Sequence, residues 1–255
     1  MDRIARDFVN RYSPAYFVGE NDPDGVYISK KTCRKNEGKI MAILDKKHEW
    51  KPIDVYNLLA WKVGKILYQC TCCCYRANDE FLYARDWQHT EDFTPSILGN
   101  EIDLKVFAHT IISDINNNGL REMATNNPQA CLEHLSKIAP CFSNGGDKLH
   151  SIYLVTLLFF LSGGYWPIFD SKAAKGLMRY SRLRNHDIWS NRRNPPSLPK
   201  TESNEFLNLF QANSHYQEYI NGLISEFGYE WRNNRDVDRA LWVYGHDVPA
   251  RCCCC

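Results

Sequence analysis

The sequence predicts an all-α, mostly helical protein, and three observations support this prediction. Apolar residues recur at helical spacing in many segments, the alternation typical of strands is scarce, and clusters of Gly and Pro separate the segments. The chain has 255 residues, of which 44% are hydrophobic and 24% charged. This ordinary globular composition excludes a disordered, collagen-like or coiled-coil protein. The length corresponds to one or two domains and suffices to bury most of the apolar surface.

Four helices are predicted in the first half of the chain: residues 38–48, 52–69, 103–117 and 119–124. Pro52 fits the first turn of its helix, where a missing backbone N–H costs nothing. The segment 21–25, Asn-Asp-Pro-Asp-Gly, is a strong turn signal, and the polar and aromatic residues 75–98 predict a loop. The remainder of the first 50 residues has a mixed pattern that predicts no regular element.

Five more helices are predicted in the second half: residues 128–139, 150–161, a helix that begins near Ser171, 204–227 and 235–244. The Pro-rich stretch 191–203 predicts an exposed loop. The apolar run from Ile152 to Leu161 suits a buried helix, and its ten residues fall short of the ~18 that a membrane span needs. Because the N-terminus also lacks the apolar stretch of a signal peptide, we expect a cytoplasmic protein without a membrane partner.

Charge and cysteine usage exclude several classes of function. Lys and Arg total 31 against 30 Asp and Glu, so any basic surface for nucleic acid must be local. Most of the eleven cysteines lie in two runs, Cys70–Cys74 and Cys252–Cys255, and near-adjacent cysteines seldom form disulfides with each other. Their spacing is not that of a zinc or iron–sulfur site. We therefore expect reduced thiols and neither metal nor cofactor, and the role of the two runs stays open.

The segment 143–177 has the residues with the most chemical content. A Gly-rich turn at 143–146 follows one predicted helix and precedes the apolar helix, and exposed backbone N–H groups in such a turn suit a phosphate. Asp170 follows Pro167 and stands at the start of the next helix. The dipole of that helix favours a negative charge at its N-terminus. A simple helix cap is the alternative role for this carboxylate.

The order of turn and acid resembles the helix-hairpin-helix DNA glycosylases, in particular the 8-oxoguanine DNA glycosylase fold. The hairpin of that family has the pattern Leu-Pro-Gly-Val-Gly-x-Lys, and Gly146 and Lys148 match its second glycine and its lysine. Asn144 replaces the first glycine. The family's Pro-x-x-Asp motif, one apolar helix later, matches Pro167 to Asp170.

The chain is also similar to divergent bacterial members of this fold that occur among phage-defence genes. Those members have a Thr-Leu-Leu-Phe-Phe segment and end with Asp-x-x-Leu-Trp-x-Tyr-Gly, and residues 156–160 and 238–245 match these two patterns. The resemblance covers residues 50–245. It implies a two-lobed fold with a cleft between the lobes, one formed by about residues 50–190 and the other by 1–49 with 191–255.

The function that this resemblance implies is excision of a modified base from double-stranded DNA. The enzyme would act as a monomer, flip the base out of the duplex and hydrolyse its N-glycosidic bond, which leaves an abasic site. Asp170 would stabilise the cationic sugar, whereas Lys148 could instead attack the sugar carbon and cut the strand. Since the spacing from Lys148 to Asp170 is longer than in the classical enzymes, we expect a monofunctional glycosylase. The excised base, its pocket and the wedge residues stay open.

Contacts to the DNA backbone are expected from the hairpin and from an arginine-rich stretch: Asn144, Gly145, Gly146, Lys148, Arg179, Arg182, Arg184, Arg192 and Arg193. A solvated charged surface is the alternative for the arginines. Two other functions are compatible with the same residues. One is a non-catalytic module with this fold that binds nucleic acid or a nucleotide in a defence system, and the other is an N-glycosidase that acts on RNA or a nucleotide.

Overall fold

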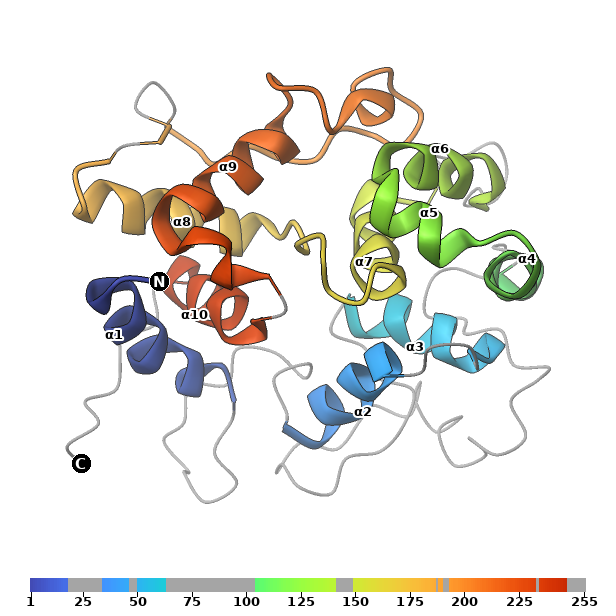
Figure 1. Ribbon diagram of the computed structural model, residues 1–255, viewed down its shortest axis with the longest axis horizontal. Helices are drawn as coiled ribbons and strands as arrows, with labels where there is room; N and C mark the ends of the chain where they lie inside the picture. The colour runs from blue at the N-terminus through green and yellow to red at the C-terminus, as the bar shows by residue number, and fades with distance from the viewer. Residues whose placement is uncertain are drawn as a thin grey trace. The chain divides into compact units, whose positions relative to one another are not determined.

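The protein is mostly helical, which confirms the all-α prediction. The computed structural model describes residues 1–17, 34–45, 50–62, 104–140, 149–186, 188–189, 193–232 and 234–246. These residues contain ten α-helices and no strand. The chain forms two compact units (Figure 1). The terminal unit consists of Met1–Phe17 and Gly164–Cys255, and the central unit consists of Val18–Gly163.

The central unit packs around one apolar helix. Its helices are α2 (Arg34–Asp45), α3 (Pro52–Lys62), α4 (Leu104–Asn117), α5 (Leu120–Asn126), α6 (Pro128–Ile138) and α7 (Ser151–Leu161). Helix α7 is apolar on all sides, and every residue from Tyr153 to Leu161 is buried, in contact with α2, α3, α5 and α6. This confirms the predicted core helix. No helix in the described part of the chain has the length and apolar character needed to cross a membrane.

The boundaries of these helices follow local capping. Helix α6 has Pro128 in its first turn, and the side chain of Asn127 accepts a hydrogen bond of 3.2 Å from the Ala130 N–H. On the buried face of α6, burial raises the pKa of the free Cys131 thiol to about 12. Cys131 is therefore a neutral core residue. The cysteine runs at 70–74 and 252–255 lie outside the described residues.

The terminal unit joins the two ends of the chain. Its elements are α1 (Arg3–Tyr12), the 3₁₀ turn η1 (Ser13–Tyr16), α8 (Ser171–Leu183), the 3₁₀ turn η5 (Phe206–Asn208), α9 (His215–Phe227), the 3₁₀ turn η6 (Gly228–Trp231) and α10 (Arg235–Gly245). Helix α1, at the N-terminus, packs against α10, near the C-terminus (Figure 1). The ring of Phe8 in α1 lies 4.3 Å from that of Tyr180 in α8 and 5.4 Å from that of Tyr244 in α10. A shared aromatic core therefore holds these helices together.

Three features of the terminal unit differ from the sequence-based expectations. Helix α1 lies in a stretch that predicted no element, although Asp2 caps it by accepting a 2.8 Å hydrogen bond from the Ala5 N–H. The predicted helix 204–227 begins only at His215, because the Ser214 hydroxyl caps α9 there and the preceding residues form turns and η5. The division of the chain falls at residue 164 rather than near 190, since α8 packs mainly on α10.

Two glycines bring α8 and α10 into backbone contact. A Cβ atom built on Gly176 in α8 would overlap the backbone carbonyl of Leu241 in α10. A Cβ atom on Gly245, at the end of α10, would overlap the backbone carbonyl of Lys172 in the first turn of α8. Because backbone atoms cannot rotate away as a flexible side chain can, only glycine fits at these two positions. Gly245 is the last residue of the Asp-x-x-Leu-Trp-x-Tyr-Gly segment. The close approach of α8 explains why a glycine is needed at this position.

We expect Gly176→Ala to lower the free energy of unfolding by about 3 kcal/mol, because the added methyl group must push α10 away from α8. Urea unfolding followed by far-UV circular dichroism measures this change. Gly38→Ala in α2 is the matched control, since a Cβ atom there meets nothing within 4 Å. The control should be neutral or stabilised by up to about 1 kcal/mol through helix propensity. Equal stabilities of Gly176→Ala and wild type would exclude the close contact.

Candidate functional site around Asp170

Asp170 occupies the N-cap position of α8. Its backbone is extended, with φ −118° and ψ 135°, and its Oδ1 accepts a 2.9 Å hydrogen bond from the Lys172 N–H. The side chain is half-buried. The residues before it are fixed from α9, because the Tyr216 hydroxyl donates a 2.7 Å hydrogen bond to the Pro167 carbonyl and Phe169 packs on Tyr219 with ring centroids 4.9 Å apart. The carboxylate is therefore held in place by both α8 and α9.

Tyr219 in α9 interacts electrostatically with the Asp170 carboxylate, and Arg235 in α10 interacts with Tyr219. Burial, and then the negative charge of Asp170, raise the pKa of the buried Tyr219 hydroxyl, while the positive charge of Arg235 opposes this rise. Arg235 comes from the first turn of α10, forms an ion pair with Asp238 and donates a 3.3 Å hydrogen bond to the Tyr16 hydroxyl. Acid, phenol and guanidinium thus come from three helices. Sequence reasoning identified only the acid, since no local pattern marks the other two.

Half-buried aromatic side chains precede Asp170. The rings of Tyr165 and Trp166 meet edge to face with centroids 4.9 Å apart, and Trp166 makes a similar contact with Phe210 at 5.0 Å. The guanidinium of Arg232 lies 4.2 Å from the centre of the Tyr165 ring, within the range of a cation–π interaction. These partly exposed rings offer flat apolar surface next to the segment that ends at Asp170.

Two of the predicted DNA-binding arginines serve structural contacts within the terminal unit. Arg179 donates a 3.0 Å hydrogen bond to the Tyr244 carbonyl, and its guanidinium lies 5.0 Å from the centre of the Tyr244 ring. Arg184, at the C-terminal end of α8, forms a 2.7 Å ion pair with Asp2 and donates a 3.3 Å hydrogen bond to the Tyr180 hydroxyl. Asp170 and Arg184 lie at opposite ends of a 13-residue helix, so about 20 Å separates them.

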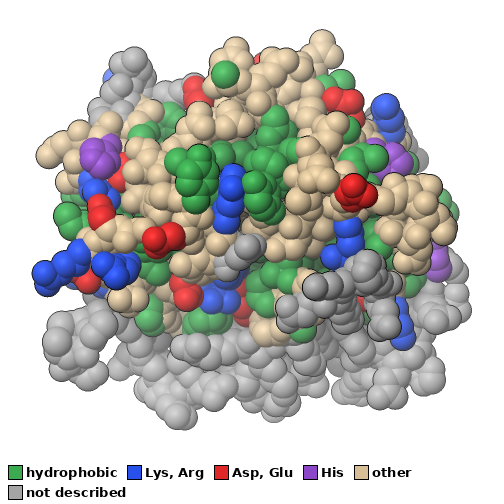
Figure 2. Space-filling view, in the orientation of Figure 1, with side chains coloured by type: hydrophobic (Ala, Val, Ile, Leu, Met, Phe, Trp, Pro, Cys, Tyr) green, Lys and Arg blue, Asp and Glu red, His purple; other side chains and the backbone are tan. Residues whose placement is uncertain are grey.

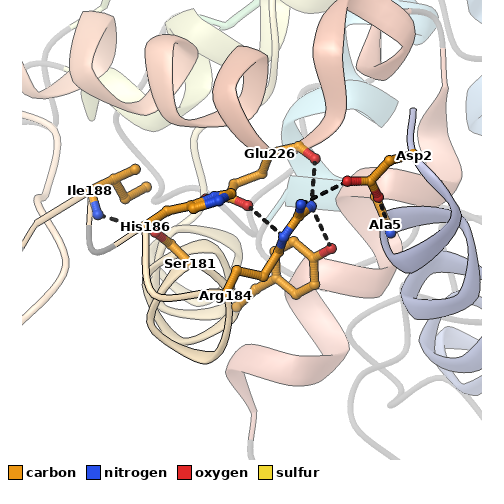
Figure 3. Close-up of polar contacts among 8 residues, drawn as sticks. Asp2, Ala5, Ser181, Arg184, His186, Ile188 and Glu226 are labelled. Carbon is orange, nitrogen blue, oxygen red and sulfur yellow. Dashed lines mark hydrogen bonds and ion pairs between the residues drawn. The ribbon is translucent and has the colours of Figure 1, made fainter.

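The cluster at the C-terminal end of α8 centres on a buried carboxylate (Figure 3). The side chain of Glu226 is fully buried, and its Oε1 lies 2.9 Å from Nδ1 of His186. Its Oε2 lies 3.7 Å from Nε of Arg184, which also bridges to Asp2. The Ala5 N–H, and then Arg184, hold the pKa of the Asp2 carboxyl below its usual value against the opposing effect of burial. The cluster fixes α1, α8 and α9 to one another, a role that no sequence pattern indicated.

Arg182 and Arg193 have exposed side chains, unlike Arg179 and Arg184. On the face shown in Figure 2, blue Lys and Arg side chains at the left of the view lie beside red Asp and Glu side chains. This mixture of charges agrees with the near-zero net charge of the chain. The remaining predicted DNA-binding residues lie outside the described residues: Asn144, Gly145, Gly146, Lys148 and Arg192.

The chain has no significant similarity to any family model, curated protein or solved structure. Assignment of a function therefore depends on the residues and geometry of the chain itself. Within the described residues, no group of three or more His, Cys, Asp or Glu side chains is arranged to hold a metal ion. The candidate site consists of the Asp170 carboxylate, the Tyr219 phenol that interacts with it, and the aromatic rings of the preceding residues Tyr165 and Trp166.

We expect Arg184→Met to lower the free energy of unfolding by about 3 kcal/mol at neutral pH, because it removes the guanidinium that pairs with the buried Glu226 carboxylate. Urea unfolding at several pH values measures the loss. A lowered carboxyl pKa contributes stability above its unfolded value and loses it as the pH falls. Part of the difference from wild type should therefore disappear below about pH 4, as Asp2 becomes protonated.

Arg182→Met is the matched control, since it removes an exposed arginine from the same helix. Its free energy of unfolding should stay within about 0.5 kcal/mol of wild type. A loss in Arg184→Met no larger than that in Arg182→Met would mean that the cluster does not stabilise the terminal unit.

Proposed function

We propose that the protein is a DNA glycosylase that flips a modified base out of the duplex and hydrolyses its N-glycosidic bond. The observation that carries this proposal is the placement of Asp170. A half-buried carboxylate caps α8. Along the chain, α8 comes after α6, a Gly-rich stretch of sequence outside the described residues, and the apolar α7. This is the order of elements expected from the resemblance to helix-hairpin-helix glycosylases.

The position of Asp170 suits the chemistry of base excision. Breaking an N-glycosidic bond passes through a sugar with positive charge, which a fixed carboxylate stabilises. Its hydrogen bond from the Lys172 N–H, together with the dipole of α8, favours the ionised form and fixes one oxygen before any substrate arrives. Little reorganisation is then needed when the positive charge develops on the sugar.

Other groups of the terminal unit support the binding of DNA. An extruded base and the unstacked duplex need apolar or aromatic surfaces, and Tyr165 and Trp166 present partly exposed rings four to five residues before Asp170. Arg182 and Arg193 are exposed and suit phosphate contacts. Arg179 and Arg184 would contribute through the structure of α8 rather than by direct contact with DNA.

The substrate to test first is modified phage DNA, because the chain resembles members of the fold found among phage-defence genes. We infer a monomeric, monofunctional enzyme. The wild-type protein should leave an abasic strand that breaks only after treatment with alkali. A covalent adduct trapped by borohydride, and lost in Lys148→Ala, would instead identify Lys148 as a nucleophile.

We expect Asp170→Asn to reduce the rate of base excision by about 10³-fold, because it removes the charge that stabilises the sugar cation. Asn is also a good N-cap residue, so α8 and the fold should be retained. Incubation with modified and unmodified DNA, followed by alkali and a gel for abasic sites, measures the rate. Circular dichroism and urea unfolding test the fold of the variant.

Near-normal excision by the folded Asn variant would exclude Asp170 as the carboxylate that stabilises the sugar cation. If the wild-type protein binds modified DNA but excises no base, the chain is a binding module rather than an enzyme. Cleavage of RNA or of free nucleotides, without cleavage of DNA, would identify an N-glycosidase with a different substrate.

Replacing Arg182 and Arg193 together by Ala should weaken DNA binding equally on all sequences, because phosphate contacts carry no sequence information. The slope of the logarithm of affinity against the logarithm of salt concentration should fall by about 2, one for each arginine that no longer neutralises a phosphate. Arg3→Ala is the control, since Arg3 is 91% exposed in α1 and lies outside the proposed DNA-binding stretch. A salt slope unchanged from wild type would show that Arg182 and Arg193 are only solvated.

A further inference from the structure

A cavity of about 330 Å³ with a mixed polar and apolar lining lies in the terminal unit, between Pro199 and the start of α9. Among the described residues, neither Asp170 nor the predicted DNA-binding arginines Arg179, Arg182, Arg184 and Arg193 line it. Hydrogen-bonding side chains form most of its wall: Asn204, Glu205, Asn208, Gln211, Asn213 and His215. Its volume falls at the lower end of the range for small-molecule sites in proteins. The described lining of the cavity therefore does not include the Asp170 carboxylate.

The wall of this cavity is fixed by its own hydrogen bonds. Nε2 of Gln211 donates a 2.7 Å hydrogen bond to Oδ1 of Asn208, and Nδ2 of Asn208 donates a 2.8 Å hydrogen bond to the Asn204 carbonyl. The Ser214 hydroxyl caps α9 by accepting from the Gln217 N–H at 3.1 Å. Both the oxygen and the nitrogen of the Asn208 side-chain amide are therefore hydrogen-bonded, which holds Asn204 and Gln211 in place around it.

Several polar groups on the wall are left to bind a ligand. The side chains of Asn204, Glu205 and Asn213 have no hydrogen-bonding partner among the described residues. Nδ1 of His215 lies 3.0 Å from the Ser197 carbonyl, which can only accept, so Nδ1 carries a proton. In the neutral imidazole, Nε2 then bears a lone pair. Donors and acceptors are therefore both present at the cavity.

The kinds of side chain on the wall restrict the class of ligand. Among the described residues, Glu205 lines the cavity and no Lys or Arg does, which disfavours a phosphate or another anion. Carboxamides present a donor and an acceptor side by side, the pattern that matches the edge of a nucleobase. The Glu205 carboxylate can accept from an exocyclic amine or a sugar hydroxyl, and Pro199 and Leu209 supply apolar wall for a base.

We propose that this amide-lined cavity binds a free, uncharged nucleoside through hydrogen bonds to the base. This site goes beyond base excision at Asp170, because it requires neither that carboxylate nor contact with DNA. A nucleoside bound there would stabilise the loop before α9, whose first turn includes Tyr216, the residue that holds Pro167.

Titration calorimetry of the full chain with adenosine, cytidine, guanosine and thymidine tests this proposal. At least one nucleoside should bind, and its 5′-monophosphate should bind more weakly because the wall contains a carboxylate and no cation. In the double variant Asn204→Ala and Asn213→Ala, the affinity should fall roughly tenfold or more. Asn221→Ala, which removes an exposed amide from α9 outside the cavity, should bind as wild type does. Asp170→Asn should also bind the nucleoside normally, whatever its effect on excision.

Failure of all four nucleosides to bind would overturn the proposal, and so would equal affinity of the double variant and wild type. Tighter binding of the monophosphate than of the nucleoside would identify an anion site elsewhere and would overturn it too. Binding of glucose but of none of the nucleosides would identify a carbohydrate pocket and would also overturn the proposal. None of these outcomes depends on whether the protein excises a base.

Discussion

The close contact between α8 and α10 is the constraint on which the terminal unit depends. Gly176 and Gly245 allow the two backbones to approach so closely that any side chain at either position would overlap a carbonyl group. This contact fixes α8 from its first turn to its middle, because Gly245 lies against Lys172 and Gly176 against Leu241. The carboxylate of Asp170 caps that first turn. Its position therefore depends on Gly176 and Gly245, two residues without a functional side chain.

Helix α9 also packs against α8 and runs in the same direction along the chain. The Tyr216 hydroxyl binds the Pro167 carbonyl just before α8, and Glu226 pairs with Arg184 at the other end. Between these points, a Cβ atom on Gly222 would meet the side chain of Leu177. These contacts hold the segment before α8 in place, as the proposed role of Asp170 requires, because electrostatic stabilisation is effective only when the charged group is already in place.

The arginines show why the positions of charged residues in a sequence do not predict which of them form a binding surface. Arg179 and Arg184 support a carbonyl and a buried carboxylate within the fold, whereas Arg182 and Arg193 are exposed. In a chain with a net charge of only +1, basic residues committed to internal ion pairs leave few for phosphates. Binding to DNA would then require the exposed arginines together with backbone N–H groups.

The sequence by itself determined the features whose causes are local. The apolar run of α7 predicts a buried helix, and Pro167 followed by Asp170 predicts a capped helix start, because both depend on neighbouring residues. The tertiary structure alone decided the contacts between distant residues. Asp2 meets Arg184 across 182 positions of the chain, and Glu226 becomes a buried ion-pair partner only when α8 and α9 pack together. Such pairs leave no periodic signal, since a charged residue in a helix looks the same in sequence whether it faces water or a partner.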